Sequence, residues 1–143
     1  MPETTETTVV DDRDQVKVFR YLADFGNLAD WDPSFDDSRR LDDGPLGVGS
    51  RFAATMSLAG RSIDVEWTLT HYDEPNRVVL DGGSDRFSSQ EDIRVEPVDD
   101  GTQVTYTGRF DTDAPDLLDA VSKPAFLLVG KAAIRGLRRT LDD

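Results

Sequence analysis

Residues 51–72 read RFAATMSLAGRSIDVEWTLTHY, and this stretch decides the fold. Large apolar residues occupy every second position from Ile63 to Leu69, and polar residues fill the positions between them. The preceding segment places Phe52 and Met56 on one face in the same way. Strict alternation is typical of a strand with one buried and one solvated face. The pair Ala59-Gly60 is short enough for a tight turn, so the stretch predicts an antiparallel hairpin.

Turn residues divide the rest of the chain into further strands. Clusters of Gly, Asp, Asn and Pro separate short runs rich in Val, Thr and aromatic residues, which is the pattern of consecutive strands. We expect additional strands at residues 4–10, 38–41, 77–80, 87–96 and 102–112. With the hairpin, this makes a sheet of about seven strands.

Helical spacing of apolar residues occurs in two places. After the first strand, residues 12–23 approximate a buried helical face that includes Val16, and a second short helix at residues 27–31 ends before Pro33. Residues 115–141 have a long helical pattern that contains Pro124, which should kink the helix or split it in two. No repeat or linker divides the chain, so we expect one α+β domain over residues 1–143.

The composition excludes several classes of protein. The net charge is −13, which argues against nucleic acid or anionic lipid as a partner. There are 23 Asp and only 3 Lys, a bias that fits either a halophile or a GC-rich genome. The longest nearly apolar stretch, residues 124–130, is far shorter than a membrane span, and the polar N-terminus does not resemble a secretion signal. We therefore expect a cytoplasmic protein, monomeric or homodimeric.

Cysteine is absent and His71 is the single histidine. Thiol nucleophiles, cysteine-ligated metals and sites with several histidines are thereby excluded. The glycines at residues 44–49 lack the Lys and Ser or Thr of a phosphate-binding loop. We expect no metal and no cofactor.

Several segments together resemble the polyketide cyclase/dehydrase and lipid-transport group of the START/Bet v 1-like (SRPBCC) superfamily. They are Phe19-Arg20-Tyr21-Leu22-Ala23-Asp24, Trp31-Asp32-Pro33, Val48-Gly49-Ser50-Arg51-Phe52, Tyr72-Asp73-Glu74-Pro75-Asn76-Arg77-Val78, Ile93-Arg94-Val95-Glu96-Pro97, Asp100-Gly101-Thr102-Gln103-Val104-Thr105-Tyr106 and the chain end from Ala133 to Leu141. The resemblance covers essentially the whole chain. It implies a helix-grip fold, in which a curved antiparallel sheet wraps around a long C-terminal helix, with two short helices after the first strand. It also implies a hydrophobic cavity, but it does not choose among cyclases, dehydratases, lipid carriers, receptors and adaptors.

In such a fold the concave face of the sheet and the C-terminal helix form the wall of the cavity. The residues expected to contact a ligand are Trp31, Phe52, Ala54, Met56, Val65, Trp67, Leu69, Tyr106, Val121 and Leu128. The alternative is that these side chains form an ordinary core, because a strand of this pattern buries them with or without a ligand.

Three residues are candidates for catalysis. Counting back from Ile93 places Glu91 on the buried face, where a carboxyl group would have a raised pKa, unless a bulge at residues 88–90 turns it to solvent. Tyr106 would donate a hydrogen bond inside the cavity or point its hydroxyl at the rim. His71 shares the parity of Leu69 and would titrate near the mouth, or lie on the surface.

Three functions remain open. The leading hypothesis is a non-catalytic protein that binds a small apolar or amphipathic molecule such as a lipid, an isoprenoid or a polyketide-like aromatic. The second is a cyclase, aromatase or dehydratase that uses Glu91, Tyr106 or His71 to move protons. The third is a protein-interaction module that presents the outer face of the sheet or the long helix.

Overall fold

The computed structural model describes residues 3–58, 60–120 and 123–141. The elements follow in the order β1 (Glu3–Val10), α1 (Gln15–Ala23), the 3-10 helix η1 (Phe25–Asn27), α2 (Leu28–Trp31), β2 (Phe35–Arg40), β3 (Arg51–Leu58), β4 (Arg61–Asp73), β5 (Arg77–Ser84), β6 (Phe87–Val98), β7 (Gly101–Asp111), α3 (Pro115–Ala120) and α4 (Lys123–Leu141). Within these residues the strands form one sheet in the order β1-β7-β6-β5-β4-β3-β2, with every neighbouring pair antiparallel.

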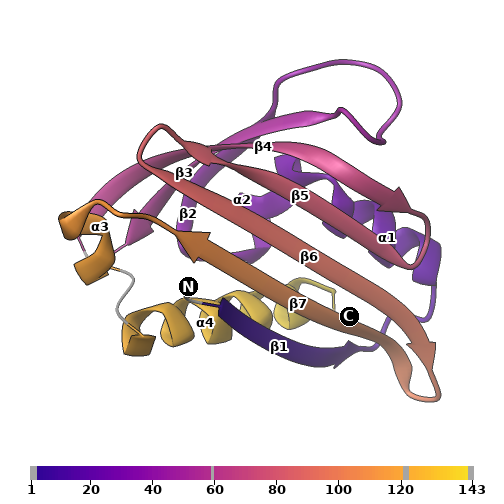
Figure 1. The fold of residues 1–143 in the computed structure, drawn as a ribbon. Helices are drawn as coiled ribbons and strands as arrows, with labels where there is room; N and C mark the ends of the chain where they lie inside the picture. Colours follow the sequence, from indigo (N-terminus) through magenta and orange to yellow (C-terminus); the bar gives the residue numbers. More distant parts are fainter. Residues whose placement is uncertain (1–2, 59, 121–122, 142–143) are drawn as a thin grey trace.

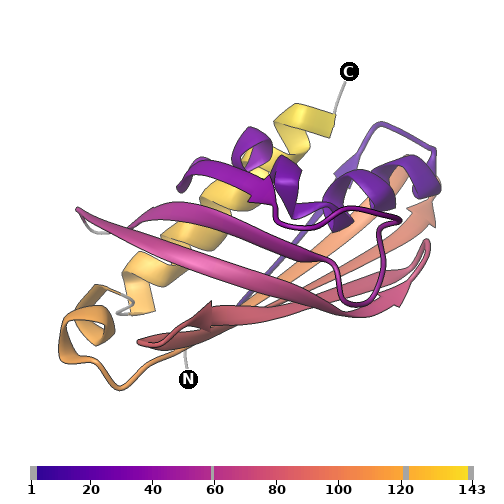
Figure 2. The same cartoon turned by 90° about the horizontal axis from the view of Figure 1, so that it is seen from above.

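The sheet is curled, and α4 runs along its concave side (Figure 1, Figure 2). The helix lies beside β1 and against α2, while α1 packs on β6 near the other end of the sheet. The buried apolar side chains of the sheet and the helices form one cluster between these layers. The predicted helix-grip class is confirmed.

The hairpin predicted from residues 51–72 is present. Phe52 of β3 pairs with Trp67 of β4, and the register continues to Leu58 opposite Arg61, which leaves a two-residue turn. Gly60 in this turn has a φ of +79°, a left-handed conformation that glycine adopts without a steric penalty. The alternation therefore buries one face of both strands, as the pattern required.

The alternation of β4 ends earlier than the sequence suggested. Leu69 is fully buried, but the register with β5 shifts between Leu69 and His71. A bulge inserts one extra residue, so the positions after it change face. His71 is therefore exposed and does not share the inward face of Leu69.

The first helix begins later than predicted. Asp14 is its N-cap, and its carboxylate accepts a hydrogen bond from the backbone N–H of Lys17 at 3.1 Å, so the helix starts at residue 15 and not at residue 12. The buried face consists of Val18, Phe19, Leu22 and Ala23. Val16, which the sequence placed on this face, is 38% exposed.

The C-terminal helical region consists of two helices, α3 and α4, and not of one kinked helix. Pro124 lies in the first turn of α4, where its missing N–H removes no intrahelical hydrogen bond. The proline therefore marks the start of a helix. Further along α4, Leu137 is fully buried, which fastens the helix to the core.

Candidate functional site

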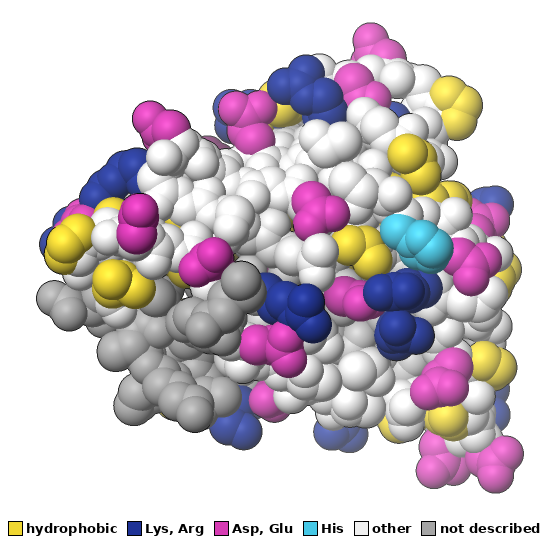
Figure 3. Space-filling view, in the orientation of Figure 1, with side chains coloured by type: hydrophobic (Ala, Val, Ile, Leu, Met, Phe, Trp, Pro, Cys, Tyr) yellow, Lys and Arg dark blue, Asp and Glu magenta, His cyan; other side chains and the backbone are white. Residues whose placement is uncertain are grey.

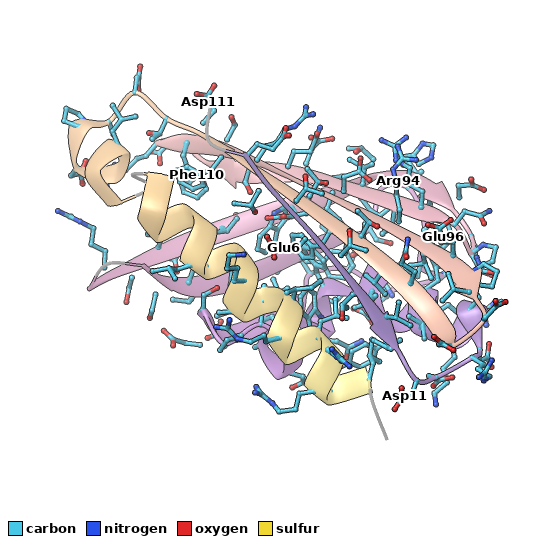
Figure 4. All side chains as sticks on the ribbon, turned by 90° about the horizontal axis from the view of Figure 1, so that it is seen from below. Glu6, Asp11, Arg94, Glu96, Phe110 and Asp111 are labelled. Atoms are coloured by element: carbon cyan, nitrogen blue, oxygen red, sulfur yellow. The ribbon has the colours of Figure 1, made fainter. Side chains whose placement is uncertain are left out.

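A cavity lies between the concave face of the sheet and α4. Its wall is mostly apolar and consists of Thr4, Asp32, Phe35, Met56, Val65, Trp67, Phe87, Ser89, Glu91, Tyr106, Gly108, Arg109, Phe110, Val129, Gly130 and Ala133. Figure 4 shows how β7 contributes: Phe110 lies on the side that faces α4, and Asp111 lies on the opposite side. The volume open to the centre of a water molecule is about 50 Å³. One water needs roughly 10–15 Å³ by this measure, so the cavity has room for only a few water molecules. A guest larger than that requires the wall to move outward.

Glu91 is the most unusual residue in this wall. The pairing of β6 with β7 runs without interruption from Ser88 to Val98, so no bulge turns Glu91 outward. Only 9% of the residue is exposed. Ser89 donates a hydrogen bond to Oε1 at 3.4 Å, whereas Oε2 is buried with no hydrogen-bond partner among the described residues. The carboxyl group thus has an unsatisfied oxygen at the cavity.

Burial raises the pKa of Glu91 from its ordinary value of 4.5 to about 8. This value already includes the opposing effect of the Tyr106 and Ser89 hydroxyls, which favour the charged form, and the smaller upward effect of the nearby Asp32 carboxyl group. The Tyr106 hydroxyl nevertheless does not give Oε2 a hydrogen bond of standard geometry. At neutral pH, Glu91 is therefore mostly an uncharged acid that can donate a proton.

Tyr106 and Gly108 on β7 shape the space around this acid. Tyr106 is 8% exposed, and burial together with the two neighbouring carboxyl groups raises the pKa of its hydroxyl well above the ordinary value. Gly108 lies directly opposite Glu91 in the sheet. A Cβ at this position would be 3.0 Å from Oε2, so the absence of a side chain here leaves room for the carboxyl group.

Asp32 is a lining residue that the sequence interpretation did not recognise as part of the site. It follows α2 and is 2% exposed, and its Oδ1 accepts hydrogen bonds from the Ser34 backbone N–H at 3.0 Å and from the Ser34 hydroxyl at 2.7 Å. Burial raises the pKa of Asp32, although the Ser34 hydrogen bonds oppose this. The available signal was an Asp two residues before a Ser, a pattern typical of a local turn, and it gave no hint of proximity to Glu91.

Four of the residues expected to contact a ligand do line the cavity, namely Met56, Val65, Trp67 and Tyr106. Four others are buried in the core outside the cavity wall, namely Trp31, Phe52, Ala54 and Leu69. Trp31 still contributes indirectly, because its ring packs edge-on against Tyr106 with 5.7 Å between the centroids. Contact of any of these residues with a ligand stays a prediction.

Two predicted positions on the helix have other outcomes. Leu128 is 65% exposed and is not part of the wall, so its predicted position is wrong. Val129 and Ala133 lie one turn apart on the inner side of α4. Leu128 directly precedes Val129, so its side chain is rotated by about 100° around the helix axis from that side. Val121 lies outside the described residues.

The polar candidates therefore separate. Glu91, Tyr106 and Asp32 meet at one cavity, whereas His71 lies on the surface. The sequence interpretation also missed the aromatic residues Phe87 and Phe110, whose rings stack with 4.6 Å between their centroids. Both follow the inward parity of Glu91 and Tyr106, so extending the alternation to the strand ends would have found them.

The described part of the chain contains no group of three or more carboxylate or histidine side chains arranged to hold a metal ion. Across the same residues, no helix combines the length and apolar character that crossing a membrane would need. Figure 3 shows charged side chains of both signs scattered over the outer face of the sheet.

A family model described as "Polyketide cyclase / dehydrase and lipid transport" matches residues 1–143. The chain belongs to this family. The resemblance inferred from the sequence segments is thus confirmed. No curated protein matches the chain significantly.

Solved structures of the same fold agree with this membership. A protein from Thermus thermophilus is 16% identical with a TM-score of 0.80, and the match covers 98% of this chain and 97% of that one. A START superfamily protein from Mycobacterium smegmatis is 12% identical with a TM-score of 0.76, and the match covers 97% and 96%. The Zhui aromatase/cyclase from a Streptomyces species is 16% identical with a TM-score of 0.78, and the match covers 97% and 92%. At such low identities the likeness concerns the fold alone.

Proposed function

We propose that this polyketide cyclase/dehydrase and lipid-transport family member binds a small apolar or amphipathic molecule between its sheet and α4, without transforming it. The observation that carries the proposal is the buried Oε2 of Glu91, which has no hydrogen-bond partner among the described residues and lies at a mostly apolar cavity. An unpaired buried polar atom typically costs about 1–3 kcal/mol. A ligand that bonds to this carboxyl group would remove that penalty.

The surrounding wall suits the rest of such a ligand. Phe35, Trp67, Phe87 and Phe110 offer aromatic surfaces, and Phe35 and Trp67 pack together with 5.7 Å between their centroids. Apolar walls with a few convergent polar groups are characteristic of small-molecule sites. The ligand would therefore place its polar end at Glu91 and Tyr106 and its apolar body among the rings.

Native mass spectrometry of the protein purified from its own host tests this proposal. We expect the wild-type protein to carry a small-molecule mass, and Val65→Phe to lose it because the larger side chain fills the cavity. The matched control is Thr107→Phe, since residue 107 alternates with the inward positions of β7. A wild-type protein that stays empty, both as purified and after incubation with an extract of its host, would contradict the proposal.

A second candidate function is dehydration of a β-hydroxy ketone. It is favoured by the meeting of two carboxyl groups, Glu91 and Asp32, with Tyr106 at one cavity. Glu91 in its acid form would protonate the leaving hydroxyl, which departs as water, while the Asp32 carboxylate takes the proton from the α-carbon and the C=C bond forms. Tyr106 would hold the ketone oxygen.

The conversion of 4-hydroxy-4-phenyl-2-butanone to benzalacetone, followed by ultraviolet absorbance, tests this candidate. We expect a rate above buffer that decreases as pH rises through about 8, because Glu91 then loses its proton. Glu91→Gln should abolish the reaction, and Glu96→Gln, an exposed position on the same strand, should not. An equal rate in Glu91→Gln would exclude Glu91 as the acid.

A further inference from the structure

Among the described residues, no Lys or Arg side chain lowers the pKa of Glu91 or Asp32, the two carboxyl groups of the cavity. Arg109 belongs to the wall, but its side chain is exposed and its guanidinium bonds to Glu3 at 2.5 Å. On α4, Lys131 is exposed and pairs with Glu6 at 3.8 Å. These two positive charges are therefore held on the outside by carboxylates of β1.

The wall of the cavity contains a hydrogen-bond donor that has no partner among the described residues. Trp67 lines the wall, and its indole Nε1–H is buried without a partner among the described residues. Tyr106 carries a hydroxyl whose raised pKa keeps it protonated, and Glu91 in its acid form carries another O–H. A buried donor without a partner, such as the indole N–H of Trp67, favours a guest that supplies an acceptor.

We propose that the polar end of the ligand is an uncharged oxygen acceptor, such as a ketone carbonyl, and that the cavity rejects carboxylates. This inference rests on the proposed function and names the chemistry of its ligand. A carboxylate would meet the carboxyl groups of Asp32 and Glu91 in a poorly solvated space with no cation to neutralise it. A protonated amine has only donors and would leave the O–H of Glu91 and the N–H of Trp67 without an acceptor, whereas a carbonyl oxygen accepts a hydrogen bond from such groups.

The same geometry makes binding of the carbonyl depend on pH. The titratable groups that face Glu91 are Asp32, after α2, and Tyr106, on β7. Its neighbour on β5 is the apolar Leu80, and the described wall of α4 is made of Val129, Gly130 and Ala133. Loss of the Glu91 proton would replace a donor by a negative charge beside the ligand oxygen. Affinity should therefore be high below the pKa of about 8 and fall above it.

Three single-ring probes that differ in their polar group test the inference: acetophenone, benzoate and benzylamine. Their dissociation constants are measured by NMR titration of the labelled protein at pH 6.5 and 9.5, where the spectrum also reports folding. At pH 6.5 we expect acetophenone to bind at least about tenfold more tightly than benzoate or benzylamine. At pH 9.5 the affinity for acetophenone should be lower than at pH 6.5. The largest possible decrease is roughly thirtyfold, which applies if the ligand binds only the form with Glu91 protonated.

Glu91→Gln and Glu96→Gln complete the experiment. The amide of Glu91→Gln retains an N–H donor that does not titrate, so acetophenone should bind equally at both pH values. Glu96→Gln should keep the pH dependence of the wild type. The inference is overturned if benzoate or benzylamine binds as tightly as acetophenone, or if Glu91→Gln retains the pH dependence. If none of the probes binds at either pH, the proposed function fails as well, which separates the two results.

Discussion

At the scale of single residues, Glu91 is the position where folding and function compete. Its carboxyl group is buried opposite Gly108, within reach of a second carboxyl group, and one of its oxygens lacks a hydrogen bond within the described chain. An apolar residue here would fit the alternation of β6 better. A buried carboxyl group with a raised pKa at a cavity is typical of functional sites. Its physical consequence is that the stability of the protein depends on pH.

We predict that Glu91→Gln removes a large part of this dependence. The folded-state pKa of about 8 is raised above the ordinary 4.5, so the contribution of Glu91 to stability is fully present below pH 4.5 and is lost as pH rises to about 8. Over this window the unfolding free energy of the wild type should fall relative to Glu91→Gln by about 1.4 kcal/mol per pH unit. Urea unfolding at several pH values measures it, with Glu96→Gln as control. Parallel stability profiles for wild type and Glu91→Gln would contradict the burial argument.

At the scale of elements, the placement of α4 depends on close contacts at both ends of the helical region. Near its C-terminal part, a Cβ on Gly136 would lie 1.9 Å from the backbone oxygen of Trp31, so only glycine permits this approach to α2. The preceding helix α3 is held by Asp116, which pairs with Arg61 at 3.3 Å and with Arg86 at 2.5 Å. These arginines come from two different hairpins, so α3 connects the strand ends beside the cavity.

We predict that Gly136→Ala destabilises the protein while Gly130→Ala does not. Both substitutions should gain about 1 kcal/mol in helix propensity. At Gly136 the new methyl group meets a backbone atom that cannot move locally, and overpacking of this kind costs about 1–3 kcal/mol or more. At Gly130 it meets the Thr4 Oγ1 at 2.8 Å, which can rotate away, and the Thr4 Cβ at 3.1 Å, which needs to shift only by a few tenths of an ångström. Thermal unfolding of the two variants compares them. Equal melting temperatures would show that α4 does not need this close contact.

At the scale of the whole molecule, the excess of carboxylates dominates. The net charge of −13 is spread over a surface on which opposite charges also pair, as Arg77 does with Asp92 at 2.8 Å and Arg20 with Glu74 at 2.9 Å. Exposed pairs of this kind contribute little individually. Repulsion among the remaining carboxylates should therefore weaken the folded state at low salt.

We predict that the melting temperature rises between 0.05 and 1 M KCl, by roughly 4 °C for each kcal/mol of relieved repulsion. Replacing the exposed Asp43, Asp85 and Asp100 by Asn neutralises three carboxylates and should reduce this rise. Differential scanning calorimetry measures both proteins, with sucrose as a nonionic control. A melting temperature that falls with salt would refute the repulsion argument. A rise that continues above 1 M, where screening is nearly complete, would favour a high-salt milieu over genome composition as the origin of the bias.

The sheet, the hairpin at Gly60 and the inward parity of Val65, Trp67 and Tyr106 could be predicted from the sequence. These features depend on alternation and turn conformation, which are local properties that each segment carries with it. Local alternation also limits how much of the site could be predicted. It indicated that Glu91 faces inward if the strand is regular, but not whether the strand is regular.

The tertiary structure alone decided the rest. The bulge that exposes His71, the meeting of Asp32 with Glu91, the close approach at Gly136 and the small volume of the cavity all arise between segments far apart in the chain. Such features depend on how several elements pack at once, and small differences in packing change which groups lose water and which oxygen lacks a partner. For that reason the sequence could name a buried acid, while only the fold shows the space that this acid faces.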